Sequence, residues 1–339
     1  MVHEVLKLEL AQEEKQAFKA SAEAINKVIK ETGLSMDKII IWFKASRLKL
    51  HILGLLPVLV GSFIAFHRTG EFKLTNLIFA ELITLFSLIA TAFANDYADI
   101  EGDKINRSFN MFSGGSRVIV DGFISRRQMF IATIVASFLS LIFSILFLIL
   151  GNGNPIILFM NLVGLFVGIE YSLSPLKINY RGGGEFLVMF MYSFFCLFFG
   201  FITQVGHGFD VNILYLSIPI ALAIFLTILI TEIPDQEADR HIGKKTLPAI
   251  LGKEASINLF LVGLQALYIS VLVLYLFGTI KKNILWGLFL SLPLGLYLSL
   301  ICLSKKKILP KHISILCAAA IILNVWINVV FTLNLMFRY

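Results

Sequence analysis

The chain alternates between long apolar runs and short polar segments. Each of the nine longest runs holds roughly the 17–25 residues that a helix needs to cross the hydrocarbon core of a bilayer. They lie at 50–66, 76–94, 128–150, 154–170, 185–205, 212–231, 256–278, 283–303 and 312–335. This pattern predicts an all-α integral membrane protein with about nine transmembrane helices within residues 41–339. Residues 1–40 are polar, and their stretch "AQEEKQAFKASAEAINKVIKETG" predicts an amphipathic helix outside the membrane or on its surface.

The composition agrees with a membrane protein and disagrees with a large soluble one. The chain is 58% hydrophobic and 15% charged, with a mean hydropathy of +0.85, whereas soluble domains carry about a quarter charged residues. The three cysteines, Cys196, Cys302 and Cys317, lie inside apolar runs without metal-site spacing. They predict neither a disulfide framework nor a zinc site.

The distribution of positive charge predicts how the helices are oriented. The connections at 95–127, 171–184, 232–255 and 304–311 together hold 15 Lys and Arg, while the opposite connections hold 4. The positive-inside rule places the first set in the cytoplasm together with the N-terminus, and an odd number of spans leaves Tyr339 on the far side. We therefore interpret the net charge of +7 as a sign of membrane orientation, expect no nucleic-acid partner, and expect a bacterial inner membrane.

Acidic residues cluster at the ends of two apolar runs on the predicted cytoplasmic side. In "NDYADIEGD", Asn95, Asp99 and Asp103 are spaced i, i+4, i+8, which puts them on one helix face about 6 Å apart. In "DQEAD", Asp235 and Asp239 have the same i, i+4 spacing. Like charges at this spacing repel each other, so the arrangement is costly unless a cation lies between them.

The two clusters have the chemistry of a diphosphate site. Mg²⁺ is usually held by one or two carboxylates together with substrate phosphates. Lys104 follows the first cluster and Lys244 the second, and each is suited to bind phosphate oxygens. We expect two Mg²⁺ ions to bind a diphosphate between the two acidic faces. The alternative is that these acids are solvated residues at helix ends, which explains one cluster more readily than two matched ones.

The paired clusters resemble the motifs of the UbiA superfamily of intramembrane prenyltransferases. That family carries N-x-x-x-D-x-x-x-D after its second helix and D-x-x-x-D after its sixth, which match Asn95/Asp99/Asp103 and Asp235/Asp239 here. The resemblance extends over roughly residues 40–335. It implies a UbiA-type bundle with cytoplasmic active-site loops, and Mg²⁺-dependent transfer of a polyprenyl group from a polyprenyl diphosphate to an aromatic acceptor. It also implies catalytic and metal-binding roles for the four aspartates, with Asn95 as a further ligand.

Three other segments are similar to the same family and extend the predicted site. "WFKASRLKL" resembles its opening segment, with Arg47-Leu48 in place of the common Arg-Pro; "GGSRVIVDGFISRRQ" resembles its diphosphate loop; and "YSLSPLKINYRGGGE" resembles its fourth-loop signature. The resemblance implies diphosphate contacts from Arg117, Lys177 and Arg181, a catalytic role for Tyr171, and substrate contacts from Arg47, Asn95, Asp96, Tyr180 and Glu185. The stretch from Tyr180 to Glu185 is most similar to the branch that prenylates 1,4-dihydroxy-2-naphthoate in menaquinone biosynthesis.

Several alternatives stay open at this stage. Lys177 and Arg181 also fit ordinary positive-inside residues, and Tyr171 also fits an aromatic-belt residue. Other members of the superfamily use 4-hydroxybenzoate, homogentisate, a glycerol phosphate ether lipid or a tetrapyrrole as acceptor. A transporter with an acidic ion site is the alternative from another class, although transporters usually place such acids near the bilayer midplane. Prenyl chain length and oligomeric state are not predicted.

Overall fold

The computed structural model describes residues 36–151, 154–304 and 310–337. Contacts between Cα atoms divide the chain into Met1–Lys44 and Ala45–Tyr339. Most of the predicted amphipathic extension at 1–40 lies outside the described residues, which begin with helix α2 (Met36–Ser46). The remaining helices belong to the second unit.

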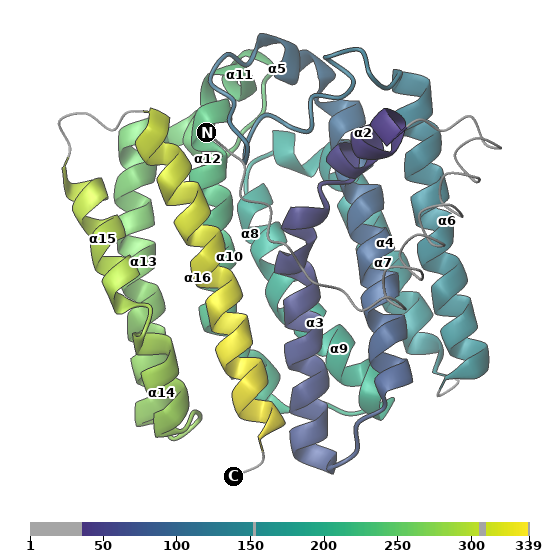
Figure 1. Ribbon diagram of the computed structural model, residues 1–339, viewed down its shortest axis with the longest axis vertical. Coiled ribbons are helices and arrows are strands. Elements are labelled where there is room, and N and C mark those ends of the chain that lie inside the picture. Colours follow the sequence, from purple (N-terminus) through teal and green to yellow (C-terminus); the bar gives the residue numbers. More distant parts are fainter. Residues whose placement is uncertain (1–35, 152–153, 305–309, 338–339) are drawn as a thin grey trace, which may run out of the picture. The chain divides into compact units, whose positions relative to one another are not determined.

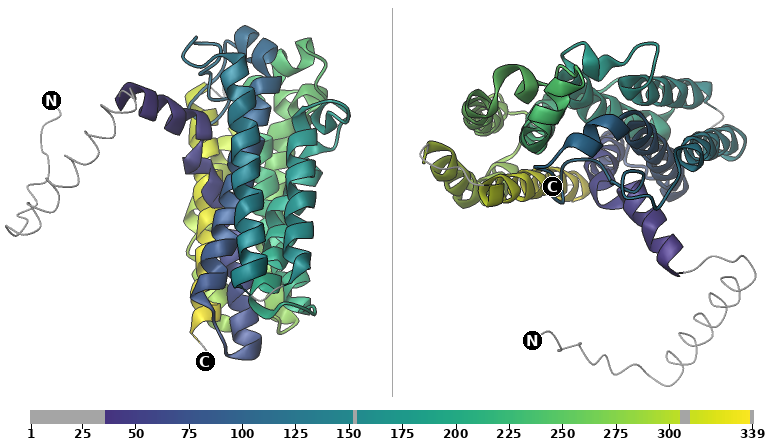
Figure 2. Two further views of the ribbon diagram at one scale, coloured as in Figure 1. Left: turned by 90° about the vertical axis from the view of Figure 1, so that its right-hand side faces the viewer. Right: turned by 90° about the horizontal axis from the view of Figure 1, so that it is seen from above.

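The second unit is a bundle of long helices that run side by side (Figures 1 and 2). The long helices are α3 (Leu48–Thr69), α4 (Leu74–Ala98), α6 (Arg126–Leu150), α7 (Pro155–Ser172), α10 (Val211–Thr231), α13 (Lys253–Leu276) and α16 (Pro310–Met336). A further span is built from α8 (Gly184–Phe190), a π-helical turn (Met191–Phe195) and α9 (Cys196–Val205). Within the described residues, eight helices are long and apolar enough to cross a membrane. The prediction of an all-α membrane protein is confirmed.

The ninth predicted span, 283–303, is a broken helix. It consists of α14 (Lys282–Phe289) and α15 (Leu292–Leu303), whose axes differ by 42°. The break exposes backbone groups that need hydrogen-bond partners in an apolar environment. The Tyr268 hydroxyl of α13 lies 2.9 Å from the Ser291 carbonyl oxygen and 3.0 Å from the Ser291 hydroxyl. A neighbouring helix thus supplies a polar group at the bend.

Helices begin and end where the sequence supplies capping groups. Ser125 precedes α6 and forms a capping box with Gln128: the Ser125 hydroxyl accepts from the Gln128 N–H at 3.2 Å, and the Gln128 side chain accepts from the Ser125 N–H at 2.8 Å. Asn154 caps α7 at 3.0 Å from the Ile156 nitrogen, and Pro155 occupies the first helical position. These caps satisfy backbone donors that would otherwise lack partners.

Small residues allow α3 and α9 to approach closely. A Cβ atom added at Gly61 would lie 1.9 Å from the Leu197 carbonyl oxygen, and one added at Gly200 would lie 2.0 Å from that of Val58. The Ser62 hydroxyl donates to the Gly200 carbonyl at 3.2 Å across the same interface. Close backbone approach at small residues is the usual way in which membrane helices gain packing energy.

A buried polar network joins α4, α6 and α7. The Asn161 side-chain oxygen accepts from Ser87 at 2.8 Å and from Ser140 at 2.9 Å, and its amide group donates to Ser144 at 2.8 Å. Because the network satisfies the side-chain oxygen and nitrogen of Asn161, its burial is not costly, and it stabilises one relative position of the three helices.

The short helices gather at one end of the bundle. They are α5 (Ile100–Ile105), α11 (Gln236–His241) and α12 (Leu247–Leu251), together with the 3₁₀ turns η1 (Ile178–Tyr180) and η3 (Ile233–Asp235). Figure 1 shows α5 and α11 close together at the upper end of the bundle. Both predicted acidic clusters lie on these elements or directly beside them.

Candidate active site

The first acidic cluster keeps one helical face although the helix breaks within it. Asp99 lies between α4 and α5 and caps both, with a φ of −91° and a ψ of 9°. The Asp99 N–H still donates to the Asn95 carbonyl at 2.9 Å, and the Asp103 N–H to the Asp99 carbonyl at 2.8 Å. The Asn95 side-chain amide donates to the Asp99 carboxylate at 2.9 Å. The i to i+4 backbone hydrogen bonds therefore continue across the break, and Asn95, Asp99 and Asp103 stay on one face.

The second acidic cluster is held by the loop that follows the first. The Asn106 amide donates to one Asp235 carboxylate oxygen at 2.6 Å, and the Gly114 N–H donates to the other at 3.1 Å. Asp239 accepts from the Thr246 hydroxyl at 3.2 Å. The two contacts with Asp235 join segments more than 100 residues apart in the sequence and bring the two clusters to one place.

Lys244 bridges the two clusters. Its ammonium nitrogen lies 2.5 Å from Asp99 Oδ2 and 3.7 Å from Asp239 Oδ1, and all three side chains are buried. Burial by itself lowers the pKa of Lys244, but Asp99 and Asp239 outweigh this effect and leave the pKa raised. A buried positive charge thus lies between one carboxylate of each cluster.

Arg47 and Asp96, both predicted to contact substrate, contact each other. The Arg47 guanidinium donates to the Asp96 carboxylate, which also accepts from the Ser116 N–H at 3.3 Å and from the Ser116 hydroxyl. Arg47 has a left-handed backbone, with a φ of 50°. The pair joins the start of α3 to the end of α4 and to the predicted diphosphate loop.

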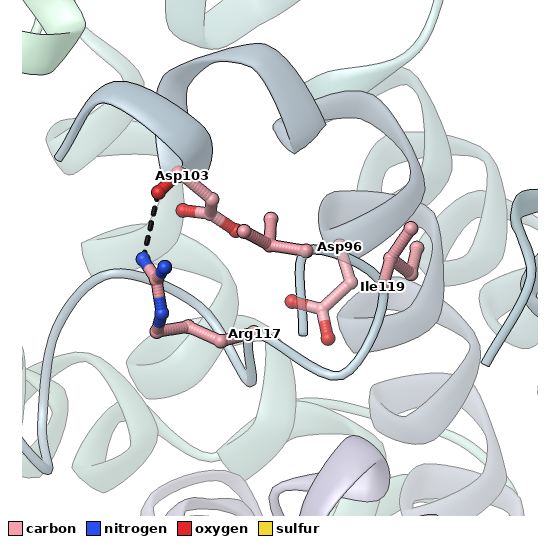
Figure 3. Close-up of a pocket in the computed structure, with 5 residues that line it drawn as sticks. Asp96, Asp103, Arg117 and Ile119 are labelled. Carbon is pink, nitrogen blue, oxygen red and sulfur yellow. Dashed lines mark hydrogen bonds between the residues drawn. The ribbon is translucent and has the colours of Figure 1, made fainter. Parts of the chain in front are cut away.

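Asp103 and Arg117 line a small hollow with Asp96, Ile119 and Val120 (Figure 3). Arg117 donates to the Asp103 backbone carbonyl at 2.7 Å, as the dashed line in Figure 3 marks. Burial raises the pKa of Asp103 to about 8, and the charges of Asp99 and Asp96 add to this effect. The charge of Arg47 opposes this rise in pKa but does not offset it.

A glycine makes room for the Asp103 carboxylate. Gly115 has a φ of +69°, and a Cβ atom added there would lie 2.4 Å from Asp103 Oδ2 and 3.1 Å from the Arg47 guanidinium. Any other residue at this position would displace the carboxylate or the arginine.

The remaining predicted phosphate contacts lie nearer the solvent. Lys104 is half exposed and pairs with Glu101 at 3.0 Å. Arg181 is exposed, and its guanidinium donates to the Leu176 carbonyl at 2.6 Å within its own loop. The Lys177 ammonium lies 5.0 Å from the centre of the Tyr180 ring. Of the predicted cations, Lys244 and Arg117 therefore lie closest to the acidic clusters.

Tyr171 and Glu185 both lie at the start of α8, and the sequence analysis did not single out the buried acid Glu232. A Cβ atom added at Gly184 would lie 3.0 Å from the Tyr171 hydroxyl oxygen, so the tyrosine packs against the start of α8. Glu185 is 1% exposed, and its Oε1 atom accepts a hydrogen bond from the Leu247 N–H. An acid directly after the apolar run 212–231 was the only sequence signal for Glu232. Nothing in the sequence signalled that Ser116 and Thr246 hydrogen-bond to Asp96 and Asp239.

The donor set fits a hard divalent cation. In the parts of the chain that the structure describes, no three His, Cys, Asp or Glu side chains converge as a metal ion requires, and the Lys244 ammonium lies between Asp99 and Asp239. The Oδ1 atom of Asp99 is buried without a hydrogen-bond partner among the described residues. Carboxylate and amide oxygens are the ligands that Mg²⁺ prefers. The residues therefore suit Mg²⁺, which would replace the Lys244 ammonium between the clusters.

Most of the chain is similar to proteins of known family. Residues 54–312 match the model of the UbiA prenyltransferase family. The chain is 28% identical over 243 residues to a 1,4-dihydroxy-2-naphthoate octaprenyltransferase of Bacillus subtilis, a match covering 70% of this chain and 74% of the relative. It is 24% identical over 318 residues to the protein of the same name from Haemophilus influenzae, covering 88% and 97% of the two chains.

Solved structures share the fold. A UbiA homolog from Aeropyrum pernix K1 superposes with a TM-score of 0.66 at 16% identity, covering 86% of this chain and 99% of that chain. A UbiA homolog from Archaeoglobus fulgidus bound to GPP and Mg²⁺ superposes with a TM-score of 0.59 at 17% identity, with the same coverage. At these identities the likeness concerns the fold.

Proposed function

The chain belongs to the UbiA prenyltransferase family, and we propose that it transfers a polyprenyl group from a polyprenyl diphosphate to an aromatic acceptor. We propose 1,4-dihydroxy-2-naphthoate as the acceptor, in menaquinone biosynthesis. The names of the two curated relatives and the stretch from Tyr180 to Glu185 support this acceptor. The excess of Lys and Arg in the loops beside the site supports a cytoplasmic location for the reaction, in a bacterial inner membrane.

One observation carries the proposal: carboxylates from both acidic clusters face a single buried cation. Asp99 and Asp239, 140 positions apart in the sequence, both approach the Lys244 ammonium. The facing carboxylates need positive charge between them, which a divalent metal ion can supply. A diphosphate bound to that metal can in turn be paired with the cationic side chains of the site. The Mg²⁺ and GPP held by the Archaeoglobus fulgidus homolog support the same ligands here.

The residues have distinct roles in this reaction. Asp99, Asp103, Asp235 and Asp239, with Asn95, would hold Mg²⁺, and bound Mg²⁺ would neutralise the charge that develops on the leaving diphosphate. Arg117 and Lys244 bind diphosphate oxygens from within the site, and Lys104, Lys177 and Arg181 do so from its rim. Arg47 and Asp96 orient the diphosphate loop through Ser116. We assign Tyr171, which packs against the start of α8, a catalytic role at the transferred carbon.

The test is a transfer assay on the purified protein in lipid. It uses Mg²⁺, polyprenyl diphosphates of several lengths and a panel of acceptors, with the products identified by mass spectrometry. Asp99→Ala and Asp235→Ala should each lower transfer by about 10²–10³-fold, as loss of a preorganised electrostatic group does. Glu101→Ala is the matched control, because Glu101 is exposed and its ion-pair partner within the described residues is Lys104. Absence of a prenylated product from every acceptor would refute the proposal.

The same assay addresses the alternatives. Product from 4-hydroxybenzoate, homogentisate, a glycerol phosphate ether lipid or a tetrapyrrole, but none from the dihydroxynaphthoate, would keep the reaction and change the acceptor. Cation uptake into proteoliposomes without any prenyl diphosphate would indicate a transporter. The position of the acids at one end of the bundle, away from the broken helix α14/α15, opposes that alternative.

A further inference from the structure

The side chain of Asn106 links the helix of the first acidic cluster to the second cluster. Asn106 belongs to neither acidic motif. It caps the C-terminus of α5, three positions after Asp103, and is buried. Its amide nitrogen donates to one carboxylate oxygen of Asp235 at 2.6 Å, although Asp235 lies 129 positions further along the chain. One amide group therefore spans the two halves of the candidate site.

Two further contacts fix the position and the orientation of the Asn106 side chain. The backbone N–H of Asn106 donates to the Gly102 carbonyl at 3.0 Å and so continues the hydrogen bonding of α5. The side-chain oxygen accepts from the Ser108 N–H at 2.9 Å and closes a tight turn. Because the oxygen is engaged in this turn, the amide presents its nitrogen, which can only donate, to Asp235.

The Asp235 carboxylate is held at both of its oxygen atoms by the same loop. Asn106 donates to Oδ1, and the Gly114 N–H donates to Oδ2 at 3.1 Å. Gly114 has a φ of +74°, and a Cβ atom added there would lie 3.2 Å from the Asn106 amide nitrogen, so the loop closes tightly over this contact. Each carboxylate oxygen has two lone pairs, and one on each remains for a metal ion. The two donors thus fix the direction in which the remaining lone pairs point.

We propose that Asn106 is a positioning residue for the metal site: it acts through Asp235, whose carboxylate it holds beside the first acidic cluster, and so sets the affinity of the site for Mg²⁺. This inference rests on the proposed function and adds the group that joins the two halves of its metal site. Hydrogen bonds from outer residues orient metal-ligating carboxylates, and loss of such a partner costs about 10–100-fold in metal affinity. Because Asn106 directly follows α5, the same contact ties Asp235 to the helix that carries Asp103.

A second asparagine in the same loop provides a matched control. The Asn110 side-chain oxygen accepts from the Phe112 N–H at 2.8 Å, which repeats the turn that Asn106 forms with Ser108. Within the residues that the structure describes, no hydrogen bond joins Asn110 to either acidic cluster. Asn106→Ala and Asn110→Ala therefore remove equivalent turns, and only the first removes the contact with Asp235.

The test measures binding of Mn²⁺, which prefers the same oxygen ligands as Mg²⁺, to the purified protein in lipid by electron paramagnetic resonance of the free ion. Asn106→Ala should raise the Kd for Mn²⁺ by roughly 10–100-fold, and Asn110→Ala by less than about twofold. Asn106→Ser keeps an oxygen that can accept from the Ser108 N–H, but its side chain ends one bond short of the amide nitrogen. It should weaken binding at least about tenfold as well, and it serves if the alanine variant does not fold.

The transfer assay distinguishes positioning from a general loss of structure. In Asn106→Ala, the Mg²⁺ concentration for half-maximal transfer should rise by roughly 10–100-fold, whereas kcat at saturating Mg²⁺ should stay within about threefold of the wild-type value. KM for the acceptor should change by less than about twofold. In an Asp235→Ala background, Asn106→Ala should have almost no further effect on Mn²⁺ binding, because the carboxylate through which Asn106 acts is gone.

The outcomes separate this inference from the function on which it rests. If folded Asn106→Ala and Asn106→Ser bind Mn²⁺ like the wild-type protein, the inference is wrong, although prenyl transfer by the wild-type protein stands. The inference is also wrong if Asn110→Ala weakens binding equally, or if the effects of Asn106→Ala and Asp235→Ala on the Kd simply multiply. If Mn²⁺ binding depends on Asn106 but the wild-type protein transfers to no acceptor, the proposed function fails and the positioning role stands.

Discussion

Replacement of Lys244 by Met removes the buried cation between the two acidic clusters. In the metal-free protein, the Asp99 and Asp239 carboxylates then lose a partner at 2.5 Å and 3.7 Å, respectively, inside a site where both are buried. Removing one partner of a buried ion pair costs about 3–5 kcal/mol, because the remaining charge stays buried and unpaired. We expect the free energy of unfolding to fall by about 3 kcal/mol. Each kcal/mol of lost unfolding free energy lowers Tm by roughly 2 °C, so we expect Tm to fall by about 6 °C.

The assay is thermal unfolding in detergent with EDTA and again with Mg²⁺. Mg²⁺ at 100 times its Kd adds about 2.7 kcal/mol to the stability of a protein that binds it only when folded. The Lys244→Met variant should gain more from Mg²⁺ than the wild-type protein does, because the metal no longer competes with an ammonium group for Asp99 and Asp239. Lys245→Met is the matched control, since Lys245 is the next residue and is exposed.

Two results would refute the reasoning. An unchanged Tm of Lys244→Met in EDTA would mean that the ammonium does not stabilise the cluster. An equal gain from Mg²⁺ in the variant and the wild-type protein would mean that metal and lysine do not share the same carboxylates.

Three further predictions follow from the site and the broken span. Gly115→Ala should lower transfer at least about tenfold, because its Cβ atom would lie 2.4 Å from Asp103 Oδ2. Gly122→Ala is the control: Gly122 has a similar φ of +77° but no neighbour within 4 Å, so this variant should lose only about 1–2 kcal/mol of stability. Burial raises the pKa of Asp103 to about 8 in the folded protein, against about 3.8 in the unfolded chain, so between these pH values the folded metal-free protein holds a proton that the unfolded chain releases. Its Tm should therefore fall from pH 5 to pH 8. The Tm of Asp103→Asn should fall less over the same range. Tyr268→Phe should cost about 1 kcal/mol of unfolding free energy through the lost contacts with Ser291, and an unchanged Tm would show that the bend needs no partner.

The spans and the two acidic faces could be predicted from the sequence because both depend on local order. Runs of apolar residues report membrane helices whatever their neighbours are, and i, i+4 spacing defines a helix face without any tertiary contact. The break in the span 283–303 was not predicted, since Pro293 near the start of α15 marks it only weakly. The hydroxyl of Tyr268, which makes the break tolerable, comes from another helix.

Which residues meet across the site was decided by the tertiary structure. Lys104 and Lys244 each follow an acidic cluster in the sequence, yet Lys104 pairs with Glu101 near the solvent and Lys244 lies buried between the clusters. The guanidinium of Arg47 contacts Asp96, which the sequence did not indicate, and its predicted substrate contact stays a prediction.

The sequence by itself determined a membrane bundle with paired acidic motifs and the family to which they belong. Only the tertiary structure decided that the Lys244 ammonium lies between Asp99 and Asp239 and that the Leu247 N–H donates to Glu185. The physical reason is range: helix formation and helix faces follow from residues a few positions apart, whereas pairing of buried charges depends on which distant segments the packed helices bring together.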